Sequence, residues 1–138
     1  MTYVKTTVLG TILATVLATS AFATDYTTLR NDKRMHGELL GASLAYLISE
    51  NCPSIKLRRL TMIGRALRLR SYAKGLGYSG DEVDSYVTAD SEKARFRSIA
   101  EPILVKKGAV PGKPETYCAV GKKEIASKTF VGTLLRAR

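Results

Sequence analysis

The chain has 138 residues, which is enough for one domain of ordinary size and too short for two. Lys and Arg number 22 against 12 Asp and Glu, so the formal net charge is +10. Hydrophobic residues at 45% and charged residues at 25% exclude a wholly disordered chain and a multi-span membrane protein. One His and two Cys exclude a zinc finger, an iron–sulfur cluster and most catalytic triads, so we predict neither a metal site nor a cofactor.

The first 23 residues predict a cleaved secretory signal peptide, which makes the mature protein periplasmic or secreted. Lys5 gives a short positive region, residues 8–17 form an apolar stretch, and Ala21-Phe22-Ala23 has the pattern of a cleavage site. An uncleaved membrane anchor is the alternative, but the strongly apolar part is shorter than the ~20 residues that span a bilayer. We therefore predict one domain over 24–138, with no integral membrane span after cleavage.

Cys52 and Cys118 are the two cysteines of the chain, and both follow the predicted cleavage site. Two cysteines in a small exported domain have one possible pairing, and an oxidising compartment favours it. The sequence therefore predicts a Cys52–Cys118 disulfide, with two buried free thiols as the alternative.

Residues 24–32 are polar and are predicted to be frayed. After them apolar side chains recur with helical spacing, and no alternation indicates a strand. The first predicted helix covers 32–51, and Gly37 and Gly41 on it suggest the close approach of another helix. Its apolar stripe consists of Leu40, Leu44, Leu47 and Ile48.

The second predicted helix covers 54–74 and carries two apolar arcs instead of one. The first arc consists of Leu57, Leu60, Ile63 and Leu67. The second arc consists of Met62, Ala66, Leu69 and Ala73. Because a surface helix normally shows one stripe, two arcs predict neighbours on two sides and a central place in the bundle.

The remaining elements are also predicted to be helical. Ser79 and Glu82 fit a capping box at the start of a third, short helix. A fourth helix begins at Asp90 or Ser91, and Pro102 is expected to kink or break it. Pro114 suits the first position of a fifth helix, and a final short helix follows near residue 130. The predicted fold is an all-α bundle of about five helices, closed by one disulfide.

Several short motifs resemble those of a known family. They are Leu76-Gly77-Tyr78-Ser79, Asp81-Glu82-Val83, Tyr86-Val87, Glu92-Lys93-Ala94-Arg95, Glu124-Ile125-Ala126 and Gly132-Thr133-Leu134-Leu135-Arg136, together with both cysteines. With them the chain resembles an uncharacterised family, a domain of unknown function, of small exported alphaproteobacterial proteins with two cysteines. The resemblance covers about Asn51 to the C-terminus. It implies export, helical content and the disulfide, and it implies no activity.

The stretch from Lys56 to Lys74 holds seven Lys and Arg and no acid, which indicates an anionic partner. The candidate anion-binding residues are Arg58, Arg59, Arg65, Arg68, Arg70 and Tyr72. The alternative is a solvated face whose charges are paired by the acids of the segment 81–92.

These observations favour a non-catalytic exported module that binds an acidic protein, a lipid headgroup or a nucleic acid through its basic helix. The first alternative is a structural envelope protein that self-assembles through Val131, Leu134 and Leu135 near the C-terminus. A small hydrolase-type enzyme is a lesser alternative, since no catalytic motif is present. His36 and Asp32 are too few ligands for a metal site. The partner and the oligomeric state stay open.

Overall fold

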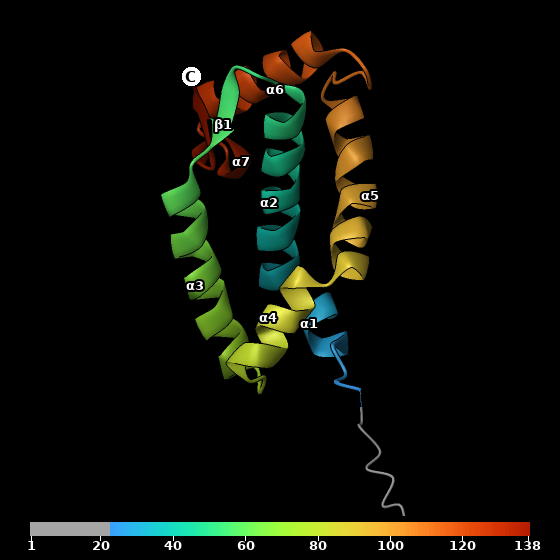
Figure 1. The fold of residues 1–138 in the computed structure, drawn as a ribbon, viewed down its shortest axis with the longest axis vertical. Coiled ribbons are helices and arrows are strands. Elements are labelled where there is room, and N and C mark those ends of the chain that lie inside the picture. Colours follow the sequence, from blue (N-terminus) through green and yellow to red (C-terminus); the bar gives the residue numbers. More distant parts are fainter. Residues whose placement is uncertain (1–22) are drawn as a thin grey trace, which may run out of the picture.

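The computed structural model describes residues 23–138, so the predicted signal peptide lies outside the described residues except for Ala23. Seven helices and one two-stranded ribbon make up this part of the chain (Figure 1). The helices are α1 (Thr27–Asn31), α2 (Lys33–Asn51), α3 (Arg59–Gly75), α4 (Gly80–Thr88), α5 (Asp90–Lys106), α6 (Pro114–Ala126) and α7 (Phe130–Thr133). The strands are β1 (Ile55–Leu57) and β2 (Leu135–Ala137). The prediction of a helical bundle is confirmed. The described residues form seven helices and not about five, since the short helices α1 and α7 are counted separately.

Helix α2 is the centre of the fold, and it packs against α1, α3, α5, α6, α7 and β1 (Figure 1). The Asp32 side chain caps its start by accepting a hydrogen bond from the Met35 amide at 2.8 Å. Its buried residues include Leu44, Leu47 and Ile48, so the predicted apolar stripe does face the core.

The two glycines of α2 differ in what surrounds them. A Cβ added at Gly41 would collide with the aromatic ring of Phe130, so α7 approaches the α2 backbone closely there. A Cβ at Gly37 would meet nothing within 4 Å. The predicted close approach is therefore confirmed at Gly41 and wrong at Gly37.

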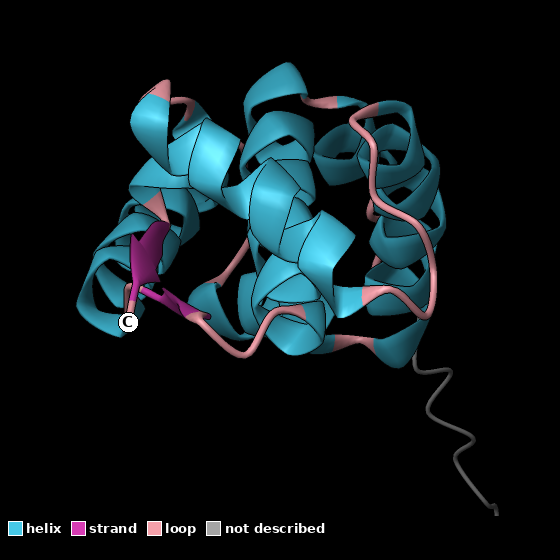
Figure 2. Cartoon of the chain, turned by 90° about the horizontal axis from the view of Figure 1, so that it is seen from above, coloured by secondary structure: helices cyan, strands magenta, loops and turns pink. Residues whose placement is uncertain are grey.

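A short antiparallel ribbon replaces the first turn of the second predicted helix. Strand β1 pairs with β2 in a register that places Ile55 opposite Ala137, Lys56 opposite Arg136 and Leu57 opposite Leu135. Figure 2 shows both strands at one edge of the helices, beside the C-terminus. The prediction of no strands was wrong because a three-residue strand is too short for alternation to be visible, and its partner lies at the far end of the chain.

The segment predicted to be frayed forms the helix α1. Leu29 is fully buried, and the ring of Tyr26 lies 5.1 Å from that of Tyr86 on α4. One leucine gives no periodic pattern, which is why the sequence did not indicate this element. The prediction of fraying over 24–32 was therefore wrong.

The later helices begin where the sequence placed them. Ser79 and Glu82 form the predicted capping box at α4, with both reciprocal hydrogen bonds present. Of the kink or break predicted at Pro102, the break does not occur, because α5 continues through this residue as one element. The helix buries Ala100 before the proline and Leu104 after it, and this packing holds both sides in one helix.

Cys52 and Cys118 form the predicted disulfide, with their α-carbons 5.1 Å apart. Cys52 directly follows α2 and Cys118 lies in α6, so the bond fixes the end of the central helix. The free-thiol alternative is therefore wrong. The core consists of a large cluster beside this bond and a smaller cluster around Leu29, Met35 and Tyr86 at the other end of α2.

Candidate anion-binding site

The six candidate anion-binding residues do not form one surface, because three of them are used within the fold. Arg65 makes two hydrogen bonds to the Glu38 carboxylate, at 2.9 and 3.0 Å, and its guanidinium lies 4.2 Å from the Phe130 ring centroid. Arg70 donates to Asp84 at 2.9 Å. The Tyr72 hydroxyl donates to Asp32 at 2.8 Å. These side chains join α3 to α2 and α4 and are not free for a ligand.

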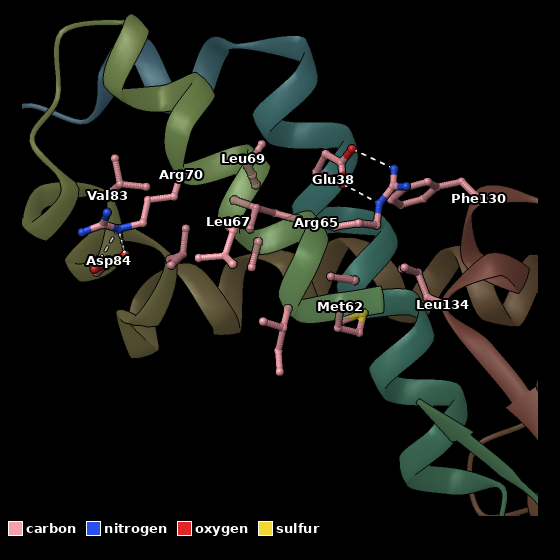
Figure 3. A pocket seen from close by; sticks show the side chains of 15 residues that line it. Glu38, Met62, Arg65, Leu67, Leu69, Arg70, Val83, Asp84, Phe130 and Leu134 are labelled. Atoms are coloured by element: carbon pink, nitrogen blue, oxygen red, sulfur yellow. Dashed lines mark hydrogen bonds and ion pairs between the residues drawn. The ribbon is translucent and has the colours of Figure 1, made fainter. Parts of the chain in front are cut away.

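Arg65 and Arg70 stand near opposite ends of an apolar groove between α2 and α3 (Figure 3). The groove has a volume of about 270 Å³. Its apolar lining residues include Leu39, Ala42, Met62, Ile63, Leu67 and Leu69. The two ion pairs therefore border a mostly apolar surface and do not form an anion site.

Five cations lie at the start of α3 and on the ribbon, and two of them are candidate residues. They are Lys56, Arg58, Arg59, Arg136 and Arg138. They line one open cleft of about 890 Å³, together with Tyr46, Glu50 and Leu60. Glu50 is the only acid in the lining, and its carboxylate accepts a hydrogen bond from Arg97 at 3.0 Å.

The ribbon register brings two cations of this cationic cleft directly opposite each other. Lys56 on β1 faces Arg136 on β2. Like charges in this arrangement repel each other and destabilise a ribbon. The backbone holds them there, because the Arg58 amide donates to the Leu134 carbonyl at 2.8 Å and the Arg138 amide donates to the Ser54 carbonyl at 2.9 Å. The fold thus holds Lys56 and Arg136 together, and neither forms an ion pair within residues 23–138.

Lys56, Arg136 and Arg138 were missing from the candidate residues. Lys56 belongs to the basic stretch, but the sequence placed it on a helix. Arg136 and Arg138 are two residues apart, which is the spacing of side chains on one face of a strand. That spacing was the available signal, and only the pairing of β1 with β2 shows that both residues lie near Arg58.

Helix α3 lies at the edge of the molecule and packs mainly on α4 and α2 (Figure 1). Its second arc contributes Leu69 and Ala73 to the core. Three residues of the first arc are uncovered, since Leu60 is 85%, Leu67 62% and Ile63 56% exposed. The fourth, Leu57, lies on β1 and packs against the large core cluster. The prediction of a central position for this helix was therefore wrong. We call Leu60, Ile63 and Leu67 the α3 ridge.

The acids of the segment 81–92 were the predicted internal partners of the basic helix. Of these, only Asp84 pairs with a cation of α3 within residues 23–138. The Glu82 carboxylate accepts from the Ser79 amide, and Asp90 pairs with Lys93. The alternative of an internally neutralised face is therefore wrong for the cationic cleft and holds for Arg70.

Two glutamates, Glu92 and Glu124, are buried, which was not predicted from the sequence. Burial alone would raise the pKa of Glu92, but hydrogen bonds from Arg30 and Arg95 hold this pKa below its ordinary value. Burial likewise opposes the ionisation of Glu124, and hydrogen bonds from Lys107 and Thr129 lower its pKa. Both groups are therefore carboxylates at neutral pH.

These carboxylates join elements of the fold. Glu92 accepts from Arg30 of α1 at 2.7 Å, and Glu124 accepts from Lys107 at 2.6 Å. Glu124 lies three residues after the buried Gly121 on α6, so its place on the inward face of that helix was the available signal.

The C-terminal apolar residues proposed for self-assembly are not available for it. Val131, Leu134 and Leu135 are all buried in the large core cluster. The alternative of assembly through these residues is therefore wrong.

Between residues 23 and 138, no three His, Cys, Asp or Glu side chains are grouped so that they can hold a metal ion. His36 instead lies with its ring 5.5 Å from that of Phe96. Within the same range no helix has the length and apolar character needed to cross a membrane.

Comparison with known proteins identifies the family. Residues 27–136 match the family of unknown function DUF5333. The chain belongs to this family. The match confirms the resemblance to an uncharacterised family and assigns no activity to it. No curated protein and no solved structure matches the chain.

Proposed function

We propose that this DUF5333 protein is an exported, non-catalytic helical module that binds an anionic partner through its cationic cleft. The observation that carries the proposal is the group of five cations Lys56, Arg58, Arg59, Arg136 and Arg138 around one opening. Among the described residues, none of the five takes part in an ion pair.

The fold itself does not need these charges. Arg58, Arg59, Arg136 and Arg138 are all exposed, and the backbone, not the side chains, makes the hydrogen bonds that hold the ribbon. Placing Lys56 opposite Arg136 costs stability, and an anion bound between them would remove that cost. Cations held together against their own repulsion are a ready binding surface for an anion.

The experiment is retention on heparin as a general polyanion, measured as the salt concentration at elution. The test variant is Arg58→Gln/Arg59→Gln/Arg136→Gln. The matched control is Lys106→Gln/Lys113→Gln/Lys122→Gln, which removes the same number of exposed positive charges from other parts of the surface. Circular dichroism checks that both variants keep the helical content of the unsubstituted protein.

We expect the cleft variant to elute at clearly lower salt than the control, because screening weakens exposed charge interactions and fewer cations then bind the polyanion. Equal decreases for the two variants would show that only net charge matters. That result would contradict the proposal.

A further inference from the structure

The α3 ridge and the cationic cleft lie on the same helix. Leu60 belongs to both, since it is 85% exposed and also lines the cleft beside Arg58 and Arg59. We infer that the anionic partner is a membrane surface rich in anionic lipid, on which α3 lies with its ridge inserted between the headgroups. This inference rests on the proposed function and names the partner.

The geometry of α3 suits a helix that lies along a surface. It has 17 residues and is therefore about 25 Å long. At 100° per residue, Leu60, Ile63 and Leu67 fall within an arc of about 60°. Figure 1 shows α3 as the outermost helix on one side of the molecule, diverging from α2 toward the ribbon. All three ridge side chains, in the first half of the helix, are more than half exposed, so a flat surface can contact them there.

The chain segment that carries the ridge contains cations and no acids. Residues 51–80 contain seven Lys and Arg and no Asp or Glu. After the pairing of Arg65 with Glu38 and of Arg70 with Asp84, five of these cations have no ion-pair partner among residues 23–138. They are Lys56, Arg58, Arg59, Arg68 and Lys74. Lys and Arg near a membrane surface are attracted to anionic lipid, and exposed aliphatic side chains beside them can enter the interface.

Other occupants fit these observations less well. A second copy of the chain would place its own α3 cations against the unpaired α3 cations of the first copy. Like charges across an interface disfavour association. An acidic protein would also satisfy the cations, but it does not by itself account for the exposed apolar ridge beside them. Leu60 projects among the cations of the cleft, and this combination suits the boundary between headgroups and acyl chains.

The chain contains no tryptophan, so a single substitution gives a local fluorescent reporter. Leu67→Trp places it on the ridge, and Val105→Trp places the matched control on α5, where Val105 is also exposed. Each full-length variant is mixed with vesicles of equimolar phosphatidylglycerol and phosphatidylcholine, or of phosphatidylcholine alone. Because both variants carry the same first 22 residues, a difference between them reports the ridge and not the N-terminus.

With the anionic vesicles we expect the emission of Leu67→Trp to move to shorter wavelength and to be shielded from acrylamide. Val105→Trp should change little, and neither variant should respond to phosphatidylcholine alone. Adding Leu60→Ser and Ile63→Ser to Leu67→Trp should weaken vesicle binding by about tenfold or more, because less apolar surface is buried. These exposed positions carry little folding stability, and circular dichroism confirms that the fold is kept.

Three results would overturn the inference. An unchanged Leu67→Trp signal, while heparin retention still depends on the cleft, would leave the proposed function intact and point to an acidic protein as the partner. Loss of both signals would remove the inference together with the proposed function. A mass that doubles with concentration, and that returns to the monomer in Leu60→Ser/Ile63→Ser, would show that the ridge joins two copies of the chain.

Discussion

Helices α2 and α3 follow each other in the chain and have similar lengths, yet one is enclosed and the other lies at the edge. Helix α2 (19 residues) is covered by six other elements, whereas α3 (17 residues) leaves its ridge uncovered. The apolar pattern alone suggests the reverse, because α3 has two apolar arcs and α2 has one stripe.

The difference lies in the residues that flank the apolar positions. Beside its stripe α2 has Gly41, Ala42 and Ala45, which are small and neutral and let neighbours approach. Helix α3 has Lys or Arg in both gaps between its arcs, and burial of an unpaired cation is costly. The two that turn inward, Arg65 and Arg70, each have an acidic partner. The charge of the flanks thus decides which helix can be enclosed.

The largest effect should come from removing the bond that fixes the end of α2. The sequence separation of Cys52 and Cys118 is 66, and a disulfide across a loop of that length contributes about 4 kcal/mol. We expect Cys52→Ala/Cys118→Ala to lower the free energy of unfolding by about this amount in urea titrations followed by circular dichroism. Reduction of the unsubstituted protein is the control and should act in the same direction. A loss below about 1 kcal/mol would show that packing alone holds α2 in place.

A matched pair of isoleucines tests the two environments directly. Ile48 on α2 is fully buried, and Ile63 on α3 is 56% exposed. We expect Ile48→Ala to cost about 3 kcal/mol, because it leaves a cavity in the core. Ile63→Ala should stay within about 0.5 kcal/mol of the unsubstituted protein, as is usual at surface positions. Urea unfolding measures both, and similar costs for the two would mean that the ridge is covered in solution.

Substitutions at a matched pair of glycines should change the stability by smaller amounts, and the two changes should have opposite signs. We expect Gly41→Ala to destabilise the protein by about 1–3 kcal/mol, because the new methyl group collides with the Phe130 ring. Gly64→Ala on α3 should stabilise it by about 0.5–1 kcal/mol, since the nearest atom to the new methyl group is the Arg68 guanidinium nitrogen at 3.7 Å. Thermal unfolding separates the two, and a destabilising Gly64→Ala would indicate a neighbour packed on α3.

The sequence allows prediction of elements whose signals are local. The spacing of Leu44, Leu47 and Ile48 identified α2, and Ser79 and Glu82 identified the start of α4. The disulfide followed from having two cysteines and an expected oxidising compartment. Elements that depend on distant partners were not predictable in this way. Strand β1 exists because residues 135–137 pair with it, and α1 is held by tertiary contacts of Leu29.

The residues of the candidate site show the same difference between local signals and distant partners. The basic stretch identified Arg58 and Arg59, which the structure leaves exposed in the cleft. It also selected Arg65, whose partner Glu38 lies 27 positions earlier on another helix and is not recognisable from spacing. Arg136 and Arg138 join the cleft only because the C-terminal strand β2 pairs with β1 in the ribbon.

The position of Arg138 has a practical consequence for anyone who purifies this protein. Its backbone amide bonds to Ser54, and its side chain lines the cationic cleft, so an affinity tag appended after it starts at the cleft. A polyhistidine or acidic epitope there would compete with any partner or occupy the opening. The exposed turn around Gly112, between α5 and α6, lies away from the ribbon and is a better position for a label (Figure 1).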